Sequence, residues 1–232
     1  MTARIEQPPI DTRSIVYVVD DDSELCEALS SLLRSVCLKT KIFGTADELL
    51  LTTLEDVPSC ILLDIRLPGI NGLDFHENLV KAGVPLPVVF MTGHGDIPMA
   101  VRAMKAGAVD FLTKPFRDQD VLDAVMRAVE RHRLRREAAT AETVLRDLYD
   151  DLSDRERQVM TLVTKGLMNK QVAAELGLSA ITVKVHRGQV MKKMSARSLA
   201  GLVRMSETLG LHRAAVHAVP YIRTQRMAHV TD

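Results

Sequence analysis

The first half of the chain alternates strand-length apolar runs with helix-length stretches, and no other feature of the sequence restricts the fold as strongly. Five runs are expected to form strands, at residues 15–19, 40–43, 60–63, 87–91 and 109–112. Because parallel strands need a crossover connection, usually a helix, this order predicts a doubly wound parallel sheet of five strands covered on both faces. In such open sheets, ligands bind beyond the carboxyl ends of the strands.

The stretches between these runs have helical spacing. One helical face is formed by five apolar residues, Leu25, Leu29, Leu32, Leu33 and Val36. The other helix-length stretches in this half are residues 46–53, 73–81 and 98–106. Pro98 suits the first turn of its helix, where a backbone N–H donor is not needed.

From Asp118 the pattern becomes helical, with an apolar stripe through Leu122, Val125 and Val129 that should pack on the sheet. The stripe then thins among charges, which favours a polar helical linker; a short coiled coil between two copies is the alternative. Past Asp151 no strand pattern remains, and a helix ending at Gly166 precedes helices over 169–176, 180–194 and 196–209.

These patterns divide the chain into four parts. They are a sheet domain over 14–130, a helical linker over 131–150, an all-helical domain over 151–210 and a tail over 211–232 of unknown role. Charge separates the halves, since residues 1–116 hold 10 basic and 16 acidic side chains, whereas residues 151–232 hold 13 and 6. The basic last third predicts a polyanionic partner, although a basic surface is also compatible with simple solvation.

Composition excludes several classes of protein. With 47% hydrophobic and 26% charged residues, the chain is neither disordered nor fibrous. No apolar run approaches the ~18 residues of a membrane span, and residues 1–13 lack a secretory signal, so no membrane association is expected. Cys26, Cys37 and Cys60 form neither a disulfide framework nor a metal-ligand pattern, and we expect them to be small core residues in a reducing cytoplasm.

Acidic side chains follow two of the expected strands. Asp20, Asp21 and Asp22 directly follow the first strand, and Asp64 follows the third in the segment LLDIRLPG. If these strand ends are neighbours, their like charges require a cation, and oxygen ligands with open water positions suit Mg²⁺. The alternative is that the first three aspartates, above all Asp22, cap the following helix.

A hydroxyl and an ammonium stand at the ends of the last two strands. Thr92 ends the fourth strand in VVFMTGHGD, and Lys114 ends the fifth in VDFLTKPF. Beside a carboxylate and a divalent cation, these groups make a site for a phosphoryl group, for which the carboxylate itself can be the acceptor. The same segment is not a GxGxxG nucleotide loop, because Pro98 stands at the third glycine position.

The segments VYVVDDD, LLDIRLPGINGLDF and FMTGHGDIPMAVRAMKAGAVDFLTKPF resemble, in order and spacing, the receiver domain of two-component response regulators. The third segment is especially similar to FixJ-type regulators. The resemblance covers roughly residues 14–129 and implies a flavodoxin-like fold. It also implies that a sensor histidine kinase phosphorylates Asp64, and that Mg²⁺ is bound by Asp20, Asp21, Asp64 and the backbone carbonyl of Arg66.

The same resemblance assigns roles to three further residues. Thr92 would contact the phosphoryl oxygens, Lys114 would neutralise them, and Phe111 would be the switching aromatic, although a plain core role for Phe111 is also open. The Lys114-Pro115 bond resembles the cis peptide of the family. Rearrangement of Thr92 and Phe111 is expected to reshape the face of the fourth helix and fifth strand, which would then pair two copies of the chain.

The last third, from LSDRERQVMTLVTKGL to RSLAGLVRM, resembles the LuxR-type output domain of the NarL/FixJ family, an all-α domain of four helices with a helix-turn-helix. Ser179 would cap the helix that enters the major groove, and the helix over 196–209 would serve dimerisation. Lys184 and Val185 are expected to touch base edges. Phosphate contacts are expected from Asn169, Lys170, Thr182, Arg187, Lys192 and Lys193.

Three positions in this helix stay open. Gly188 departs from relatives that carry a longer side chain there, so a base preference cannot be transferred. Lys192 and Lys193 fit a solvated basic face as well as phosphate contacts. His186 is compatible with a DNA contact or with packing, and packing is favoured.

The sequence therefore predicts a cytoplasmic response regulator that a histidine kinase phosphorylates, and that dimerises and binds double-stranded DNA to regulate transcription, with RNA polymerase as a further partner. It is not expected to act as an enzyme on a separate metabolite. One alternative is an adaptor whose output domain binds protein. The other is an aspartate-nucleophile phosphatase, although VYVVDDDSE lacks the usual DxDxT motif. The kinase, its stimulus, the operator and the direction of regulation are not encoded in these patterns.

Overall fold

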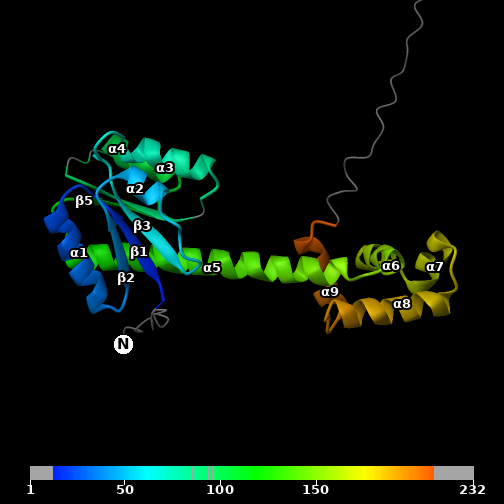
Figure 1. The fold of residues 1–232 in the computed structure, drawn as a ribbon. Helices are drawn as coiled ribbons and strands as arrows, with labels where there is room; N and C mark the ends of the chain where they lie inside the picture. Colours follow the sequence, from blue (N-terminus) through cyan, green and yellow to red (C-terminus); the bar gives the residue numbers. More distant parts are fainter. Residues whose placement is uncertain (1–12, 85, 94, 96, 212–232) are drawn as a thin grey trace, which may run out of the picture. The chain divides into compact units, whose positions relative to one another are not determined.

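The computed structural model describes residues 13–211 apart from residues 85, 94 and 96, and it divides after Ala138 into two compact units (Figure 1). Each unit is described by itself. Of the expected tail over 211–232, only Leu211 lies within the described residues. No helix in the described part of the chain is long and apolar enough to cross a membrane.

Five parallel strands in the order β2-β1-β3-β4-β5 form the sheet of the first unit, which confirms the predicted fold class. The strands are β1 (Ile15–Val19), β2 (Lys39–Phe43), β3 (Ser59–Asp64), β4 (Val88–Thr92) and β5 (Asp110–Thr113). All residues of β1, β3 and β4 are buried, because helices cover both faces of a parallel sheet. This flavodoxin-like order places a switch point between β1 and β3, where the carboxyl ends open a crevice.

The helices of this unit are α1 (Ser23–Ser35), α2 (Ala46–Leu50), α3 (Gly72–Lys81), α4 (Ile97–Lys105) and α5 (Asp118–Asp150). Successive side chains of β1 point to opposite faces of the sheet and so enter two cores. Tyr17 packs in one core with Phe75 of α3, and Val18 packs in the other with Leu33 of α1 and Val125 of α5. Helices α2, α3 and α4 thus cover one face, and α1 and α5 cover the other (Figure 1).

Two sequence predictions for this unit are wrong in detail. The second helix ends at Leu50 instead of residue 53, and the Thr52 hydroxyl donates to a carbonyl of the last turn. Cys37 is exposed and is not a core residue, whereas Cys26 and Cys60 are buried as expected. Cys37 follows α1 directly and has a left-handed backbone with a φ of 62°. Its side chain therefore points to solvent instead of entering the core.

Helix α5 continues without a break through the segment expected to be a helical linker. Its first half is buried on the sheet at Val121, Ala124, Val125, Ala128, Val129 and His132. Residues 137–144 are exposed on every side of the helix, as a solvated helix would be.

The second unit is entirely helical in its described part, with α6 (Asp154–Thr164), α7 (Asn169–Leu176), α8 (Ala180–Lys193) and α9 (Leu199–Thr208). A capping box between Ser153 and Glu156 starts α6. Gly177 ends α7 with a φ of 65°, which makes the tight turn into α8 possible. One small core joins α6, α7 and α8 through Val159, Val172 and Val183.

Candidate functional site

The carboxyl edge of the sheet gathers the acidic residues of two neighbouring strands. Val19 of β1 is in register with Leu63 of β3, so the next residues, Asp20 and Asp64, meet at the switch point. Carboxylate oxygens of Asp20, Asp21 and Asp64 all lie within 4.8 Å of one another. Asp20 is 2% exposed and Asp64 7% exposed, whereas Asp21 is open to solvent.

Asp22 belongs to the helix and not to this group. Its side chain accepts a hydrogen bond from the Leu25 N–H at 3.0 Å and is the N-cap of α1. The capping alternative therefore holds for Asp22, while Asp20 and Asp21 lie together with Asp64.

Lys114 reaches the same group of carboxylates from the end of β5. Its Nζ lies 2.6 Å from Asp20 Oδ2 and 3.1 Å from Asp64 Oδ2. The Lys114 N–H donates to the Thr92 carbonyl at 2.7 Å, and the Lys114-Pro115 peptide is cis, as the resemblance implied. The Lys114 ammonium thus lies directly between the two buried carboxylates of Asp20 and Asp64.

The charges at this site are not fully balanced by the lysine. Burial raises the pKa of the Asp20 carboxyl above its usual range, although the hydrogen bond from Lys114 acts in the opposite direction. Burial also acts to lower the pKa of the Lys114 ammonium, but its hydrogen bonds to Asp20 and Asp64 outweigh burial and raise it. The Lys114 ammonium therefore does not offset the desolvation of Asp20. Three hard oxygen donors within 4.8 Å of one another fit a divalent cation such as Mg²⁺.

Thr92 and Phe111 lie beside this group on β4 and β5. Thr92 is fully buried at the end of β4, next to the strand that carries Asp64. Phe111 is half-buried and packs against the core on the α3 and α4 side of the sheet. Both the core role and the position expected of a switching aromatic are compatible with this placement.

Two glycines that the sequence analysis did not assign shape the site. A Cβ on Gly72 would lie 2.3 Å from the Asp64 carbonyl oxygen, so only glycine lets α3 start against the strand that carries Asp64. A Cβ on Gly95 would lie 2.9 Å from Phe111 Cε1 and 3.1 Å from Thr92 Cγ2. The motifs NGLDF and TGHGD carry these glycines, but their close contacts arise only when the chain folds back on itself after β3 and β4.

Arg66 follows β3 by two residues and is exposed. Its N–H donates to Asp64 Oδ1 at 3.3 Å, and it forms an isolated bridge with Asn71. The backbone of Arg66 therefore lies beside the Asp64 carboxylate. The resemblance to receiver domains implies that the Arg66 carbonyl is a Mg²⁺ ligand at this place.

In the second unit, α8 turns an apolar side inward and a mixed side outward. Val183, Val190 and Met194 are buried, whereas Ile181 is 78% and Val185 58% exposed. The outward face also carries Lys184, Gly188 and Lys192, and Lys170 is exposed at the start of α7. Exposed apolar residues beside lysines on one helix face suit the thymine methyl groups and the acceptor-rich edges of a DNA major groove.

The remaining residues of the predicted DNA contact set take part in contacts within this unit. Arg187 is half-buried and its Nη1 donates to Asn169 Oδ1 at 3.1 Å, which ties α8 to α7. Thr182 lies 2.8 Å from the Ser179 hydroxyl at the N-cap. Lys193 donates to Glu156 Oε2 at 2.7 Å. His186 is half-buried, which is compatible both with a DNA contact and with packing.

Comparison with known proteins finds a matching family for each of the two units. The family model for the response regulator receiver domain matches residues 16–126, and the model for bacterial regulatory proteins of the luxR family matches residues 150–206. Nodulation protein W of Bradyrhizobium diazoefficiens is 60% identical over 200 residues, which cover 86% of this chain and 88% of that protein.

Two solved structures are similar over most of the chain. The response regulator StyR is 45% identical with a TM-score of 0.75, covering 84% of this chain and 98% of that one. Full-length FixJ from B. japonicum is 35% identical with a TM-score of 0.51, covering 86% of this chain and 98% of that one. The similarity therefore spans both units and not the receiver-like half alone.

Proposed function

Since this chain belongs to the NarL/FixJ family of two-component response regulators, we propose that a histidine kinase phosphorylates it on Asp64 and that phosphorylation pairs two copies on DNA. The family combination of a receiver and a LuxR-type output domain makes the chain a DNA-binding transcription regulator. The observation that supports Asp64 as the acceptor is its position, nearly buried, 3.1 Å from the Lys114 ammonium and within 4.8 Å of the Asp20 and Asp21 carboxylates.

Mg²⁺ would be held by Asp20, Asp21, Asp64 and the backbone carbonyl of Arg66. Bound there, it would neutralise negative charge on the phosphoryl group during transfer. Asp20 would be a ligand and a partner of Lys114, since its Oδ2 accepts from Nζ at 2.6 Å. The three carboxylates come from segments fixed by β1 and β3, so the cage is preorganised.

Phosphoryl transfer needs one nucleophile and charge stabilisation. An Asp64 carboxylate oxygen attacks phosphorus of the kinase phosphohistidine, the P–N bond breaks with its electron pair on the imidazole, and an acyl phosphate forms. Lys114 stabilises the charge on the transferred oxygens, and the Thr92 hydroxyl donates to one of them. The chain would catalyse only formation and hydrolysis of its own acyl phosphate.

The switch would act through Thr92, Gly95 and Phe111. Because Gly95 has no Cβ, the Phe111 ring and the Thr92 side chain can both pack against it. When Thr92 moves toward the phosphoryl group, the space that it leaves beside Gly95 becomes free. Phe111 could then turn inward, and the outer face of β5 and α4 would change shape.

We propose this outer face as the dimer surface. Ile97, Val101 and Met104 of α4 are exposed by 81%, 46% and 48%, and such an apolar stripe on a helix is typical of a partner-binding face. A C₂ pair through this stripe would bury the same residues on both copies. Two output units would then be available for two DNA half-sites.

On DNA, the outward face of α8 would enter the major groove. Lys184 and Val185 would touch base edges, and Lys170 and Lys192 would contact phosphates. Asn169, Thr182 and Arg187 would position α8 and could reach phosphates from the same edge. We place this activity in the cytoplasm, where kinase, DNA and RNA polymerase, the expected transcription partner, are accessible.

A protein-binding adaptor is the second candidate function. Ile181 and Val185 of α8 favour it, because exposed apolar side chains can also pack against a protein surface. DNA binding predicts a steep loss of affinity with salt because counterions are released, whereas a protein contact through these apolar residues predicts a shallow one. The phosphatase alternative predicts turnover of free phosphate esters.

The proposal is tested by sedimentation of the full chain with acetyl phosphate and Mg²⁺. We expect the wild type to become dimeric and to retain duplex DNA fragments, and the Asp64→Asn variant to stay monomeric. Asp47→Asn, an exposed carboxylate in the first turn of α2, is the matched control and should dimerise like the wild type. Equal dimerisation of Asp64→Asn and wild type would contradict the assignment.

A further inference from the structure

Helix α8 carries a glycine that packing within the output unit does not require. Gly188 is exposed in the interior of this 14-residue helix. A Cβ on Gly188 would have no described atom within 4 Å, apart from its chain neighbours and the backbone of α8 itself. Glycine in a helix interior lowers stability relative to alanine, because its backbone loses more conformational freedom on folding. The described contacts of the unit thus give no reason for glycine at this position.

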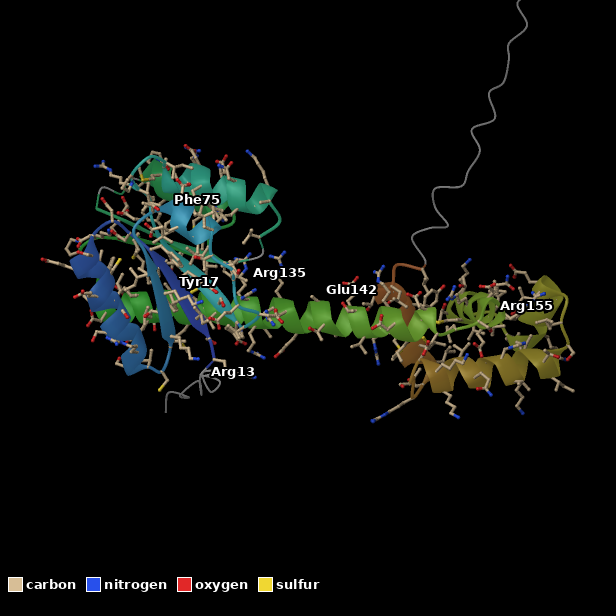
Figure 2. All side chains as sticks on the ribbon, in the orientation of Figure 1. Arg13, Tyr17, Phe75, Arg135, Glu142 and Arg155 are labelled. Carbon is tan, nitrogen blue, oxygen red and sulfur yellow. The ribbon has the colours of Figure 1, made fainter. Side chains whose placement is uncertain are left out.

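Gly188 lies in the middle of the outward face of α8. Ile181 stands two turns before it and Lys192 one turn after it, so helical spacing aligns the three residues along one stripe. Val185 and Lys184, one turn before Gly188, flank this stripe and are exposed. Figure 2 shows side chains with nitrogen at their tips that extend from the side of α8 away from α6. The outward face thus has a gap at Gly188 that is surrounded by apolar side chains and lysines.

The side chains around this gap define the chemistry of a partner. Ile181 is 78% and Val185 58% exposed, and both are β-branched, so little side-chain freedom is lost when they make a contact. The lysines of the same face favour a polyanion. In the major groove of DNA, the thymine methyl group is an apolar feature beside hydrogen-bond acceptors. The outward face of α8 therefore complements base-pair edges that carry methyl groups.

We propose that Gly188 lets the backbone of α8 approach the base edges closely, so that Ile181 and Val185 each cover a thymine methyl group in a half-site. This inference rests on the proposed DNA binding, and it names the base feature that the face recognises. Glycine suits a place where a backbone comes close to a ligand, because no side chain intervenes. Gly188 is thus a positioning residue, and Ile181 and Val185 determine specificity.

A side chain at position 188 would separate the helix from the bases. It would extend from the middle of the face and keep both apolar side chains away from the methyl groups. Phosphate contacts of the lysines depend less on this approach, because a flexible four-carbon stem can span the added distance. Binding to base edges and binding to the DNA backbone should therefore respond differently to a larger residue at this position.

The first test uses the phosphorylated full chain and a duplex that it selects from a random pool, synthesised with thymine or with uracil, which lacks the methyl group. We expect uracil to weaken binding by about three- to fourfold for each methyl group that is removed from a contact. In the double variant Ile181→Ala and Val185→Ala, the two duplexes should bind alike. Val144→Ala, which truncates a 53% exposed valine of α5, is the matched control and should keep the wild-type preference for thymine.

The second test separates the stability of α8 from its affinity for DNA. Gly188→Ala should slow amide hydrogen exchange in residues 180–193 by about two- to fivefold, because alanine stabilises a helix. The same variant should weaken binding to the thymine duplex by roughly fivefold or more and reduce its preference over uracil. Its binding to random duplexes should stay unchanged, since those contacts are made to phosphates.

The inference is overturned if the wild type binds the thymine and uracil duplexes alike, or if Gly188→Ala keeps the full affinity for the selected duplex. It is equally overturned if Val144→Ala loses the preference for thymine as the double variant does. A wild type that retains no duplex from the pool would contradict the proposed DNA binding as well, so the two failures are distinguishable.

Discussion

At the scale of single residues, Gly72 connects the start of α3 to the strand that carries Asp64. A Cβ there would lie 2.3 Å from the Asp64 carbonyl oxygen and 2.9 Å from Ile65 Cα, and both are backbone atoms that cannot rotate away. The position of the Asp64 carboxylate therefore depends on a residue that has no functional side chain of its own.

We predict that Gly72→Ala lowers the free energy of unfolding by about 1–3 kcal/mol through overpacking, and slows phosphorylation of Asp64. Urea denaturation and the rate of phosphorylation by acetyl phosphate are the two measurements. Gly201→Ala in α9 is the control, because a Cβ there would only touch Ser198 Oγ at 3.5 Å. Unchanged phosphorylation in Gly72→Ala would show that the close approach is not needed.

His132 is a second residue with a measurable effect, because it joins α5 to the start of β3. Its Nδ1 accepts the Ser59 N–H at 2.8 Å, and the residue is 4% exposed. Burial lowers the pKa of the imidazole below its ordinary 6.5, and the nearby Arg136 and Arg135 act in the same direction, while Asp56 opposes them. The folded state therefore binds the proton less well than the unfolded chain.

It follows that the contribution of His132 to the stability of the receiver is complete above pH 6.5 and is lost as the pH drops below it, since protonation favours the unfolded state. We predict a shallower decline between pH 7 and 5 in His132→Gln, with a slope that differs by at most about one proton. Chemical denaturation followed by circular dichroism over this range gives the slope. An identical slope in wild type and variant would remove His132 from this account.

Sequence reasoning at this scale identified Asp20, Asp64, Thr92 and Lys114 because each directly follows or ends a strand. Parallel strands bring their carboxyl ends to one edge, so chemistry at strand ends can be inferred from the sequence alone. It could not identify Gly72 or Gly95, since a close approach depends on how the loops after β3 and β4 fold back, which no residue pattern describes. Cys37 was misplaced for a similar reason, because the left-handed backbone at the end of α1 decides its exposure.

At the scale of elements, α4 differs from the other receiver helices in exposing most of its apolar residues. We predict that Val101→Glu leaves phosphorylation of Asp64 unchanged and prevents phosphorylation-dependent dimerisation, because two like charges would meet across the pair. Sedimentation of the phosphorylated variant gives the result. Leu51→Glu, at an 88% exposed apolar residue after α2, should dimerise normally. A dimeric Val101→Glu would mean that another face pairs the copies.

If α8 enters the major groove as proposed, its variants can separate base contacts from phosphate contacts. We predict that Lys184→Ala costs about 1–3 kcal/mol on a selected operator fragment and little on random DNA, because a base edge loses its donor. Lys192→Ala should weaken both alike and reduce the salt slope by about one. Lys81→Ala, on the receiver, is the control. If both α8 variants behave identically, the division between them is wrong.

Strands were predicted almost to the residue because fully buried β1, β3 and β4 appear as continuous apolar runs. Helix ends were harder to predict, because they depend on local capping and not on apolar periodicity alone. Helix α2 ends where Leu51 and Thr52 cap its last turn. The pairing of Arg187 with Asn169 also escaped prediction, because it joins two helices across the turn at Gly177.

At the scale of the whole molecule, the account combines an acidic receiver with a basic output unit. Residues 1–116 carry 16 acidic against 10 basic side chains, and residues 151–232 carry 6 against 13. The first part gathers carboxylates at the carboxyl edge of its sheet, and the second exposes lysines on the outward face of α8. In the proposed function, the chemistry in the first part would regulate DNA binding by the second, and that dependence would rest on Asp64.

The most direct test is to map the phosphoryl group itself. The full chain is incubated with acetyl phosphate, with and without Mg²⁺, and the acyl phosphate is located by mass spectrometry after borohydride reduction. We predict Mg²⁺-dependent modification at Asp64 that disappears in Asp64→Asn and falls sharply in Lys114→Ala. Modification at another residue, or equal modification of Asp64→Asn, would contradict the central claim that this carboxylate receives the signal.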